Sequence, residues 1–169
     1  FRSFQMFNHG TISAMLFILV GVIYDRAHHR DINGFGGIGT IMPVYTGIVA
    51  LAFFAGLGLP SLSGFVSEAM CFLGAFPVFK GIVIIATIGI LLNAAYFLWA
   101  FQRIFLGEMN EKYKDLPEIN GRELFTVIPL AVITLLFGIY PYPFLKYIGE
   151  TVNVIIEQVV AVGSLAGVM

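Results

Sequence analysis

The chain has 169 residues, of which 59% are hydrophobic and 11% are charged, and its formal net charge is −1. Soluble domains carry about 25% charged residues, so this composition indicates an integral membrane protein. The net charge excludes a strongly basic nucleic-acid-binding protein, and the single cysteine, Cys71, excludes an internal disulfide framework or a cysteine metal site. Because the chain begins at Phe1 rather than at methionine, we expect a fragment of a longer protein.

The first expected membrane helix covers about residues 3–24 and carries a polar stripe. Gln5, His9 and Ser13 fall at positions i, i+4 and i+8, with Asn8 beside them. In lipid such a stripe must face other protein or a hydrated cavity, so it suits hydrogen bonding between helices or a proton relay. A lone histidine in such a helix is more often a packing residue. An acidic side chain is expected nearby and histidine titrates near physiological pH, so we interpret His9 as a relay candidate.

The densest polar run in the first half of the chain follows, from Tyr24 to Asp31. Its simplest interpretation is a solvated loop with charges near the lipid headgroups. His28 and His29 lack the i, i+4 spacing and the third ligand of a metal site, so we expect no metal there. The glycine-rich stretch 33–39 follows no strand, which makes nucleotide binding unexpected.

The apolar run 43–76 is too long for one straight span. At ~1.5 Å per residue it would extend about 50 Å, against a bilayer core of ~30 Å. Pro60 lacks an N–H and clashes with a preceding helical turn, and the glycines around it favour non-helical backbone. Ser61 and Ser63 are suited to cap a new helix. We therefore predict two half-helices, about 43–57 and 62–76, joined by a break near 57–62.

Glu68 is the only charged side chain in this run, about one turn into the second half-helix. A charge at the bilayer centre costs roughly 2.5–3.5 kcal/mol unless it is paired, hydrated or protonated. Desolvation favours the protonated carboxyl, whereas a helix N-terminus favours the carboxylate. A group under both influences is suited to proton transfer. The alternative is a carboxylate that lies at a membrane surface and faces water.

Two further spans are expected, over about 79–106 and 123–140. We expect Asn93, at mid-depth in the first of them, to bond to a neighbouring helix, with a direct proton role as the alternative. The side of the loops 24–40 and 107–122, with Arg103 at the end of the adjoining span, holds six lysine and arginine residues against three on the opposite side. This asymmetry predicts that both loops lie on the cytoplasmic side.

The last segment, about 144–162, has a different pattern. Glu150, Asn153 and Glu157 recur at i, i+3 and i+7 against isoleucine and valine. This favours an amphipathic helix in the membrane interface or against a partner over a fifth span. Together the elements predict an all-α membrane protein with about four transmembrane helices, one of them broken, plus a C-terminal amphipathic helix.

Several motifs occur in an order that resembles one family of membrane proteins. They are a His-Gly pair on the first helix (His9-Gly10), the Tyr-Asp-Arg-x-His-x-Arg-Asp run, a Gly-Gly pair, the Gly-Leu-Pro and Gly-Phe-x-x-Glu sequences of the broken helix, and a final Gly-x-x-Pro-x-Pro. Over essentially all 169 residues the chain resembles the antiporter-like subunit M, or chain 4, of proton-pumping NADH:quinone oxidoreductase, respiratory complex I. Subunits of multisubunit sodium/proton antiporters and membrane-bound hydrogenases share the architecture and are alternatives.

The resemblance implies a fold of fourteen transmembrane helices in inverted repeats, two of them broken. Residues 1–169 would be the C-terminal part of this one antiporter-like domain. The family's essential membrane lysines and first-channel glutamate would then lie outside the chain, which could not form a complete proton channel alone. The family usually has glycine where this chain has Ser61, and often where it has Ser67, and both differences could alter the shape of the break.

The resemblance also implies roles for individual residues. Glu68 matches a proton-channel residue on the exit side, and His9 matches a histidine of the central hydrophilic axis. Supporting roles are expected for Gln5, Ser13, Tyr24, Asp25, Arg26, His28, Arg30, Pro60 and Asn93. The chain has no motif for NADH, flavin or an iron–sulfur cluster, so the redox cofactors are expected in partner subunits and no cofactor or metal is expected in this chain.

The expected function is that of a proton-translocating membrane subunit of NADH:quinone oxidoreductase, with the redox chemistry elsewhere in the complex. Its expected partners are the lipid bilayer and neighbouring antiporter-like subunits, with no nucleic acid. The expected location is an energy-coupling membrane, such as the bacterial plasma membrane or an equivalent inner membrane. One alternative is a sodium/proton antiporter or hydrogenase subunit. Another is a structural membrane module in which the polar groups only hold helices together.

Overall fold

The structure, a computed structural model, describes residues 2–165, apart from the side chains of Arg2 and of part of the segment 151–165, Asn153 included. The described chain is helical and contains no strand, which confirms the all-α class. Its elements are α1 (Arg2–Ala27), η1 (Ile32–Gly34), α2 (Ile38–Ile41), α3 (Pro43–Gly56), α4 (Ser63–Ala75), α5 (Lys80–Phe105), η2 (Glu111–Tyr113), α6 (Gly121–Ile139) and α7 (Tyr142–Leu165).

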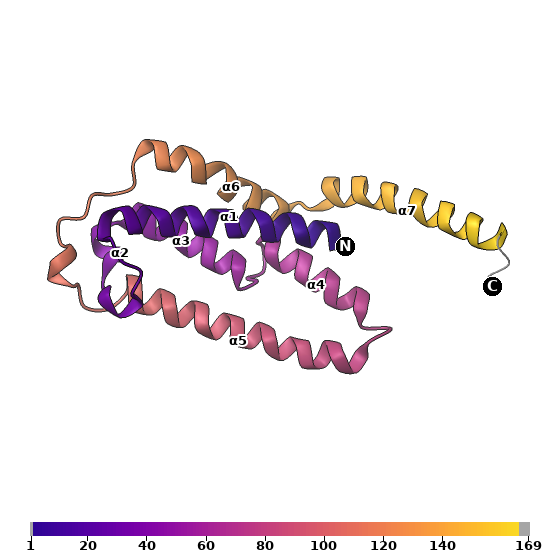
Figure 1. Cartoon of the computed structure of the whole chain (residues 1–169), viewed down its shortest axis with the longest axis horizontal. Helices are drawn as coiled ribbons and strands as arrows, with labels where there is room; N and C mark the ends of the chain where they lie inside the picture. Colours follow the sequence, from indigo (N-terminus) through magenta and orange to yellow (C-terminus); the bar gives the residue numbers. More distant parts are fainter. Residues whose placement is uncertain (1, 166–169) are drawn as a thin grey trace.

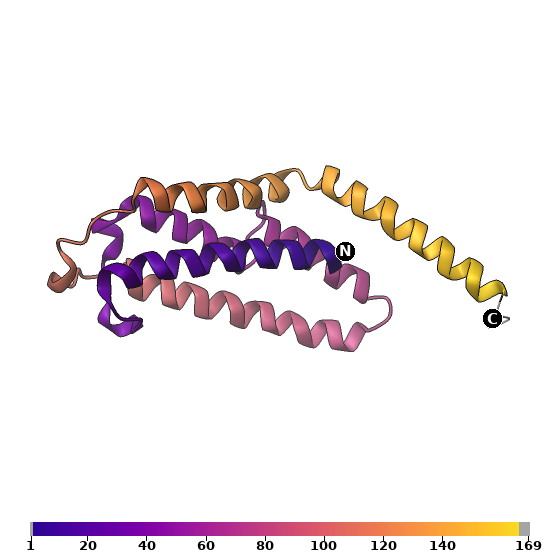
Figure 2. The ribbon, with the colours of Figure 1, turned by 45° about the horizontal axis from the view of Figure 1, so that its top comes forward.

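The helices α1, α3, α4, α5 and α6 form an elongated bundle, and α4 continues in the direction of α3 after a short interruption (Figure 1). One end of the bundle carries the segments with η1, α2 and η2, and we call it the loop end (residues 26–45 and 105–123). The opposite end carries the turn between α4 and α5. There α7 leaves the bundle and extends away from it, as both views show (Figure 2).

Three of the described helices are long and apolar enough to cross a membrane: α1 over Ser3–Ala27, α5 and α6. The helices α3 and α4 are apolar but have only 14 and 13 residues. At ~1.5 Å per residue neither reaches across a ~30 Å bilayer core, so the two in succession make one broken crossing. The helix α7 is not among the candidate spans in the described part of the chain. This agrees with the prediction of four crossings, one of them broken, and a separate C-terminal helix.

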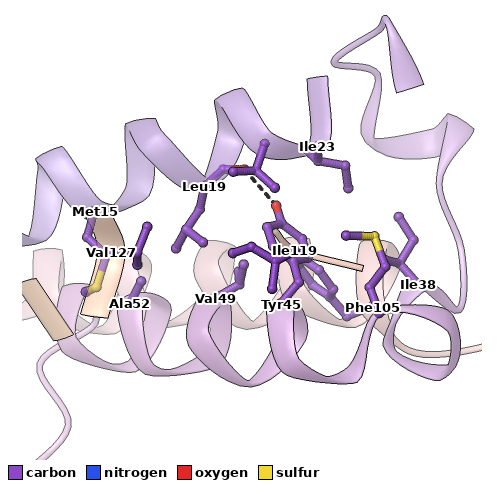
Figure 3. Packing of buried hydrophobic residues seen from close by; sticks show 12 residues of the cluster. Met15, Leu19, Ile23, Ile38, Tyr45, Val49, Ala52, Phe105, Ile119 and Val127 are labelled. Carbon is purple, nitrogen blue, oxygen red and sulfur yellow. Dashed lines mark hydrogen bonds between the residues drawn. The ribbon is translucent and has the colours of Figure 1, made fainter. Parts of the chain in front are cut away.

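A buried apolar cluster holds the loop-end half of the bundle together (Figure 3). Met15, Leu19 and Ile23 recur on one face of α1 at the spacing of an amphipathic helix and pack against Tyr45 and Val49 of α3. The Tyr45 hydroxyl donates a hydrogen bond to the Leu19 carbonyl at 2.8 Å, so this buried polar group is satisfied. The cluster fixes α1 against α3 and thereby positions the interruption that follows α3.

The first helix is longer than predicted. It ends at Ala27 rather than near residue 24, so Tyr24, Asp25 and Arg26 lie in its last turn and not in a loop. The Arg26 guanidinium donates a hydrogen bond to the Val22 carbonyl at 2.8 Å. A cation in the last turn is also favoured by the negative end of the helix dipole. These contacts account for the extra turn.

Candidate functional site

The interruption between α3 and α4, residues 57–62, is called the break from here on. Gly58 and Ser61 both have φ of +80°. The Leu62 N–H donates to the Leu59 carbonyl at 3.2 Å, with Pro60 and Ser61 between them. Proline at the second position and a positive φ at the third are the features of a type II turn. Pro60 therefore lies within the predicted break, in a specific turn that places Ser61 in a conformation preferred by glycine.

The predicted caps at the start of α4 are wrong. The N-cap residue is Leu62, and no side chain accepts a hydrogen bond from the first turn there. Ser61 lies in the turn, and the buried Ser63 is already the first helical residue, with its Oγ lacking a hydrogen-bond partner among the described residues. Ser61 is used by the turn, and α4 begins one residue too early for Ser63 to occupy the N-cap position.

Two asparagines from neighbouring helices bind the backbone on either side of the break. Asn93 of α5 donates through Nδ2 to the Gly56 carbonyl at 2.9 Å, which satisfies one of the carbonyls left free where α3 ends. Asn8 of α1 donates through Nδ2 to the Ser63 carbonyl at 3.1 Å. Asn93 thus bonds to a neighbouring helix, as predicted. The sequence placed Asn8 beside the polar stripe but assigned it no role.

Glu68 lies on α4 with its carboxylate directed back towards the break. A Cβ added at Gly58 would come within 3.1 Å of Glu68 Oε2, so the absence of a side chain at Gly58 leaves room for the carboxylate. The side chain is half-buried, and it has a Coulombic interaction with His9. The break lies about midway along the bundle (Figure 1).

A cavity of ≈ 360 Å³ opens beside Glu68, between α1, α4 and α5. Its polar lining comes from Gln5, Glu68 and Asn93, and Cys71 forms part of the wall. Gln5 Oε1 is buried and has no partner among the described residues. The cavity therefore joins one residue of the predicted stripe on the first helix to the predicted acidic residue.

Of the rest of that stripe, His9 is exposed and Ser13 is half-buried. On α1, His9 Nε2 lies 3.5 Å from the Ser13 hydroxyl, at the limit of a hydrogen bond. His9 and Ser13 thus lie beside the cavity rather than in its lining.

The polar run after the first helix separates into distinct roles at the loop end. The Arg26 side chain is 7% exposed and forms an ion pair with Glu123 at 2.8 Å. It also donates to the carbonyls of Pro117 and Glu118, at 2.9 and 3.1 Å. These bonds join α1 to the segment that leads into α6, away from Glu68.

The other four predicted residues of the run are exposed. The Arg30 guanidinium lies 4.8 Å from the centre of the Tyr24 ring. Asp25 is exposed, and the exposed His28 has a positive φ of 57°. The structure therefore brings none of the five predicted residues of this run to the cavity beside Glu68.

Two acidic residues of the loop end were missed by the sequence analysis. The Glu118 carboxylate accepts hydrogen bonds from the Val44 and Tyr45 N–H groups at 3.1 and 3.2 Å, and so caps α3 from a distant part of the chain. Glu123 accepts from the Asn120 N–H at 2.7 Å in a capping box that starts α6. The Asn-x-x-Glu spacing in the sequence indicates the capping box of Glu123. Nothing local in the sequence indicates that Glu118 caps α3.

No group of three or more histidine, cysteine, aspartate or glutamate residues within the described part of the chain is arranged to hold a metal ion. The chemically distinctive arrangement is thus a half-buried carboxylate in an interrupted membrane helix, near a histidine and beside a largely apolar cavity whose lining includes two amide side chains. Such a carboxylate can bind and release a proton, and water held at the polar groups of the cavity can carry it.

Comparisons with known proteins show close relatives. A family model described as NADH:quinone oxidoreductase/Mrp antiporter, transmembrane, matches residues 2–93. The chain is 42% identical over 165 residues to NADH-quinone oxidoreductase subunit M of Rhodobacter capsulatus, covering 96% of this chain and 32% of the relative. It is 36% identical over 160 residues to F(420)H(2) dehydrogenase subunit M of Methanosarcina mazei, covering 95% and 32%.

A solved structure is also similar. A chain of respiratory complex I from Thermus thermophilus with bound NADH superposes with a TM-score of 0.78 at 28% identity, over 85% of this chain and 30% of that chain. The chain thus spans about a third of the length of the relatives that it matches.

Proposed function

The chain belongs to the NADH:quinone oxidoreductase/Mrp antiporter transmembrane family, and we propose that it supplies the proton-transfer residues Glu68 and His9 to a proton-translocating subunit of NADH:quinone oxidoreductase. It is a multi-pass integral membrane protein of an energy-coupling membrane. In this proposal the flavin and iron–sulfur clusters are held by other subunits, and the energy of the redox reaction changes the ionisation of buried groups in this one.

The observation that carries the proposal is the position of the Glu68 carboxylate. It lies next to Gly58 in the break, has a Coulombic interaction with His9 and lines a cavity with Gln5 and Asn93. No hydrogen bond fixes this carboxylate to another described residue. A carboxyl group with no ion pair and no hydrogen bond to the protein can exchange its proton with water in the cavity. A structural carboxylate in a membrane, in contrast, normally has an ion-pair partner.

The supporting residues divide into two groups in this proposal. Pro60 and Asn93 shape and hold the break, Gln5 lines the cavity, and Ser13 contacts the His9 ring. The residues Tyr24, Asp25, Arg26, His28 and Arg30 act at the loop end, where they maintain the fold rather than transfer protons.

The test is the substitution Glu68→Gln in the intact complex. The glutamine amide is nearly the same size as the carboxyl group but neither takes up nor releases a proton near neutral pH. We expect electron transfer to artificial acceptors to stay near the wild-type rate, while proton transport per electron falls. Proton transport is measured with a pH-sensitive dye in proteoliposomes and electron transfer by oxidation of the donor.

The matched control is Glu111→Gln, because Glu111 is an exposed acid at the loop end. It should change neither rate. Unchanged proton transport in Glu68→Gln would contradict the assignment of Glu68. A loss of assembled complex in both Glu68→Gln and His9→Ala, without a change in transport per assembled complex, would instead favour the structural membrane module.

A second possibility concerns the partners. The likeness to a subunit M of F(420)H(2) dehydrogenase favours a complex of the same kind that takes electrons from a donor other than NADH. The two complexes are distinguished by whether the purified complex oxidises NADH or another electron donor. A sodium/proton antiporter subunit would instead transport protons in exchange for sodium without any electron donor, which a sodium-dependent pH change in donor-free vesicles would reveal.

A further inference from the structure

Three buried side-chain oxygens lack a hydrogen-bond partner among the described residues: Gln5 Oε1, Asn8 Oδ1 and Ser63 Oγ. All three lie on the polar side of α1 or in the first turn of α4. Asn8 is 1% exposed and Ser63 is 0% exposed, so bulk solvent does not reach them. A buried polar group without a partner costs about 1–3 kcal/mol, and native proteins satisfy nearly all such groups with protein atoms or ordered water.

Two of the three oxygens belong to residues that touch each other. Asn8 Nδ2 donates to the Ser63 carbonyl at 3.1 Å, so the amide plane that carries Oδ1 lies against the first turn of α4. Ser63 supplies both that carbonyl and the unpaired Oγ. The N-cap residue Leu62 provides no side-chain acceptor for this turn. The contacting residues Asn8 and Ser63 thus each carry a buried oxygen without a partner, at a helix start whose first N–H groups have no side-chain cap.

We propose that one ordered water molecule is bound at this place, between Asn8 Oδ1 and Ser63 Oγ, as a fixed part of the contact between α1 and α4. Water can donate to both oxygens and accept from an N–H group of the first turn, and buried waters typically make about three such bonds. A cation would be repelled by the positive end of the α4 dipole. An anion would be repelled by the amide oxygen of Asn8. Water is the ligand that is complementary to both kinds of group.

The water would have a consequence for the acidic residue, and this consequence rests on the proposed function of Glu68. Ser67, which precedes Glu68, donates its hydroxyl to the carbonyls of Ser63 and Gly64, each at 3.0 Å. The first turn of α4 and the segment that carries Glu68 are thus bonded together. Asn8 and Ser63 are therefore positioning residues, which fix where the first turn of α4 lies along α1.

The substitution Ser63→Ala tests the site through the sign of its effect on stability. If Ser63 Oγ is a ligand of bound water, its removal leaves the water with one partner fewer, and the melting temperature of the assembled complex falls. If the hydroxyl is unpaired, its removal relieves a buried unsatisfied group, and the melting temperature rises or stays the same. The second result overturns the proposal.

The matched control is Thr134→Val, which removes a fully buried hydroxyl that already donates to the Leu130 carbonyl at 2.8 Å in its own helix. We expect a smaller fall than in Ser63→Ala, and Ser63→Thr, which keeps a hydroxyl, should retain more stability than Ser63→Ala.

An electron cryo-microscopy map of the complete complex gives an independent test. We expect a density peak within about 3.2 Å of both Asn8 Oδ1 and Ser63 Oγ. A map that resolves other buried waters but shows no peak there overturns the proposal. Neither measurement depends on proton transport, so failure of the water site leaves the role of Glu68 intact, and failure of Glu68 leaves the water site intact.

Discussion

The loop end and the break differ in how completely their polar groups are paired. At the loop end, the Arg26 guanidinium donates five hydrogen bonds to carbonyl and carboxylate oxygens, and Glu118 accepts from the start of α3. At the break, Asn8 and Ser63 each keep one unpartnered oxygen among the described residues, and Glu68 is held by no hydrogen bond there.

Helix α1 is therefore joined to the segment that leads into α6 by saturated polar contacts at the loop end, and to α4 by an incomplete one at the break. Saturated networks in a low-dielectric interior are rigid, whereas a carboxyl group that no hydrogen bond holds, as at Glu68, is free to exchange its proton. The difference suggests that the loop end maintains the frame and that the break carries out the exchange.

The largest effect is expected from Arg26→Ala at the loop end. Glu123 loses its ion-pair partner, and the Pro117 and Glu118 carbonyls lose their donor. Breaking a buried pair costs 3–5 kcal/mol, and because Glu123 is 24% exposed we expect about 3 kcal/mol of lost unfolding free energy. Denaturation by sodium dodecyl sulfate in mixed micelles measures it.

The control for Arg26→Ala is Arg30→Ala, which removes only a stacking contact with the exposed Tyr24 ring and should cost less than about 1 kcal/mol. In complexes that assemble, Arg26→Ala should leave proton transport per electron unchanged. A selective loss of transport would place Arg26 on the proton path and would contradict a purely structural role for the loop end.

Arg26 also shows where sequence reasoning stops. The sequence identified it as part of a motif, but its partner Glu123 is 97 residues away, and only the folded chain reveals the pair. The break could be predicted, because Pro60 and the length of the apolar run are local signals. The position of the α4 start could not be: Ser61 lies in a type II turn, and the N-cap position falls on Leu62, which leaves Ser63 as the first helical residue.

The next effect is expected at the edge of the break, from Asn93→Leu. This substitution leaves the Gly56 carbonyl without its donor from α5, and an unpaired carbonyl of this kind costs about 2 kcal/mol. The melting temperature of the purified complex should fall. Thr87→Val on the same helix is the control, because the Thr87 hydroxyl only donates within α5, to the Val83 carbonyl. A normal melting temperature combined with lost proton transport would show that Asn93 takes part in the transfer itself.

A smaller loss of stability and a selective loss of transport are expected from Gly58→Ala. The new Cβ would come within 3.1 Å of Glu68 Oε2, so the carboxylate must move away from the break. The positive φ of 80° adds about 1 kcal/mol of strain for alanine. Proton transport per electron should fall while electron transfer continues. Gly47→Ala in α3 is the control, since a Cβ there meets nothing within 4 Å. Normal transport in Gly58→Ala would mean that the position of the carboxylate beside Gly58 is not required.

The smallest expected effect is a gain of stability from Ser61→Gly. Ser61 is held at φ +80° as the third residue of the turn, where glycine avoids a strain of about 1 kcal/mol. A rise in melting temperature would show that the strain is real, whereas Ser61→Ala, which keeps the strain, should give no rise. No rise in either variant would contradict the strained turn. Proton transport by the same variant shows whether the strain has a function. If Ser61→Gly stabilises the complex and slows proton transport, the strained turn helps the break to change conformation. If proton transport is unchanged, the Glu68 side chain alone is the mobile part of the site.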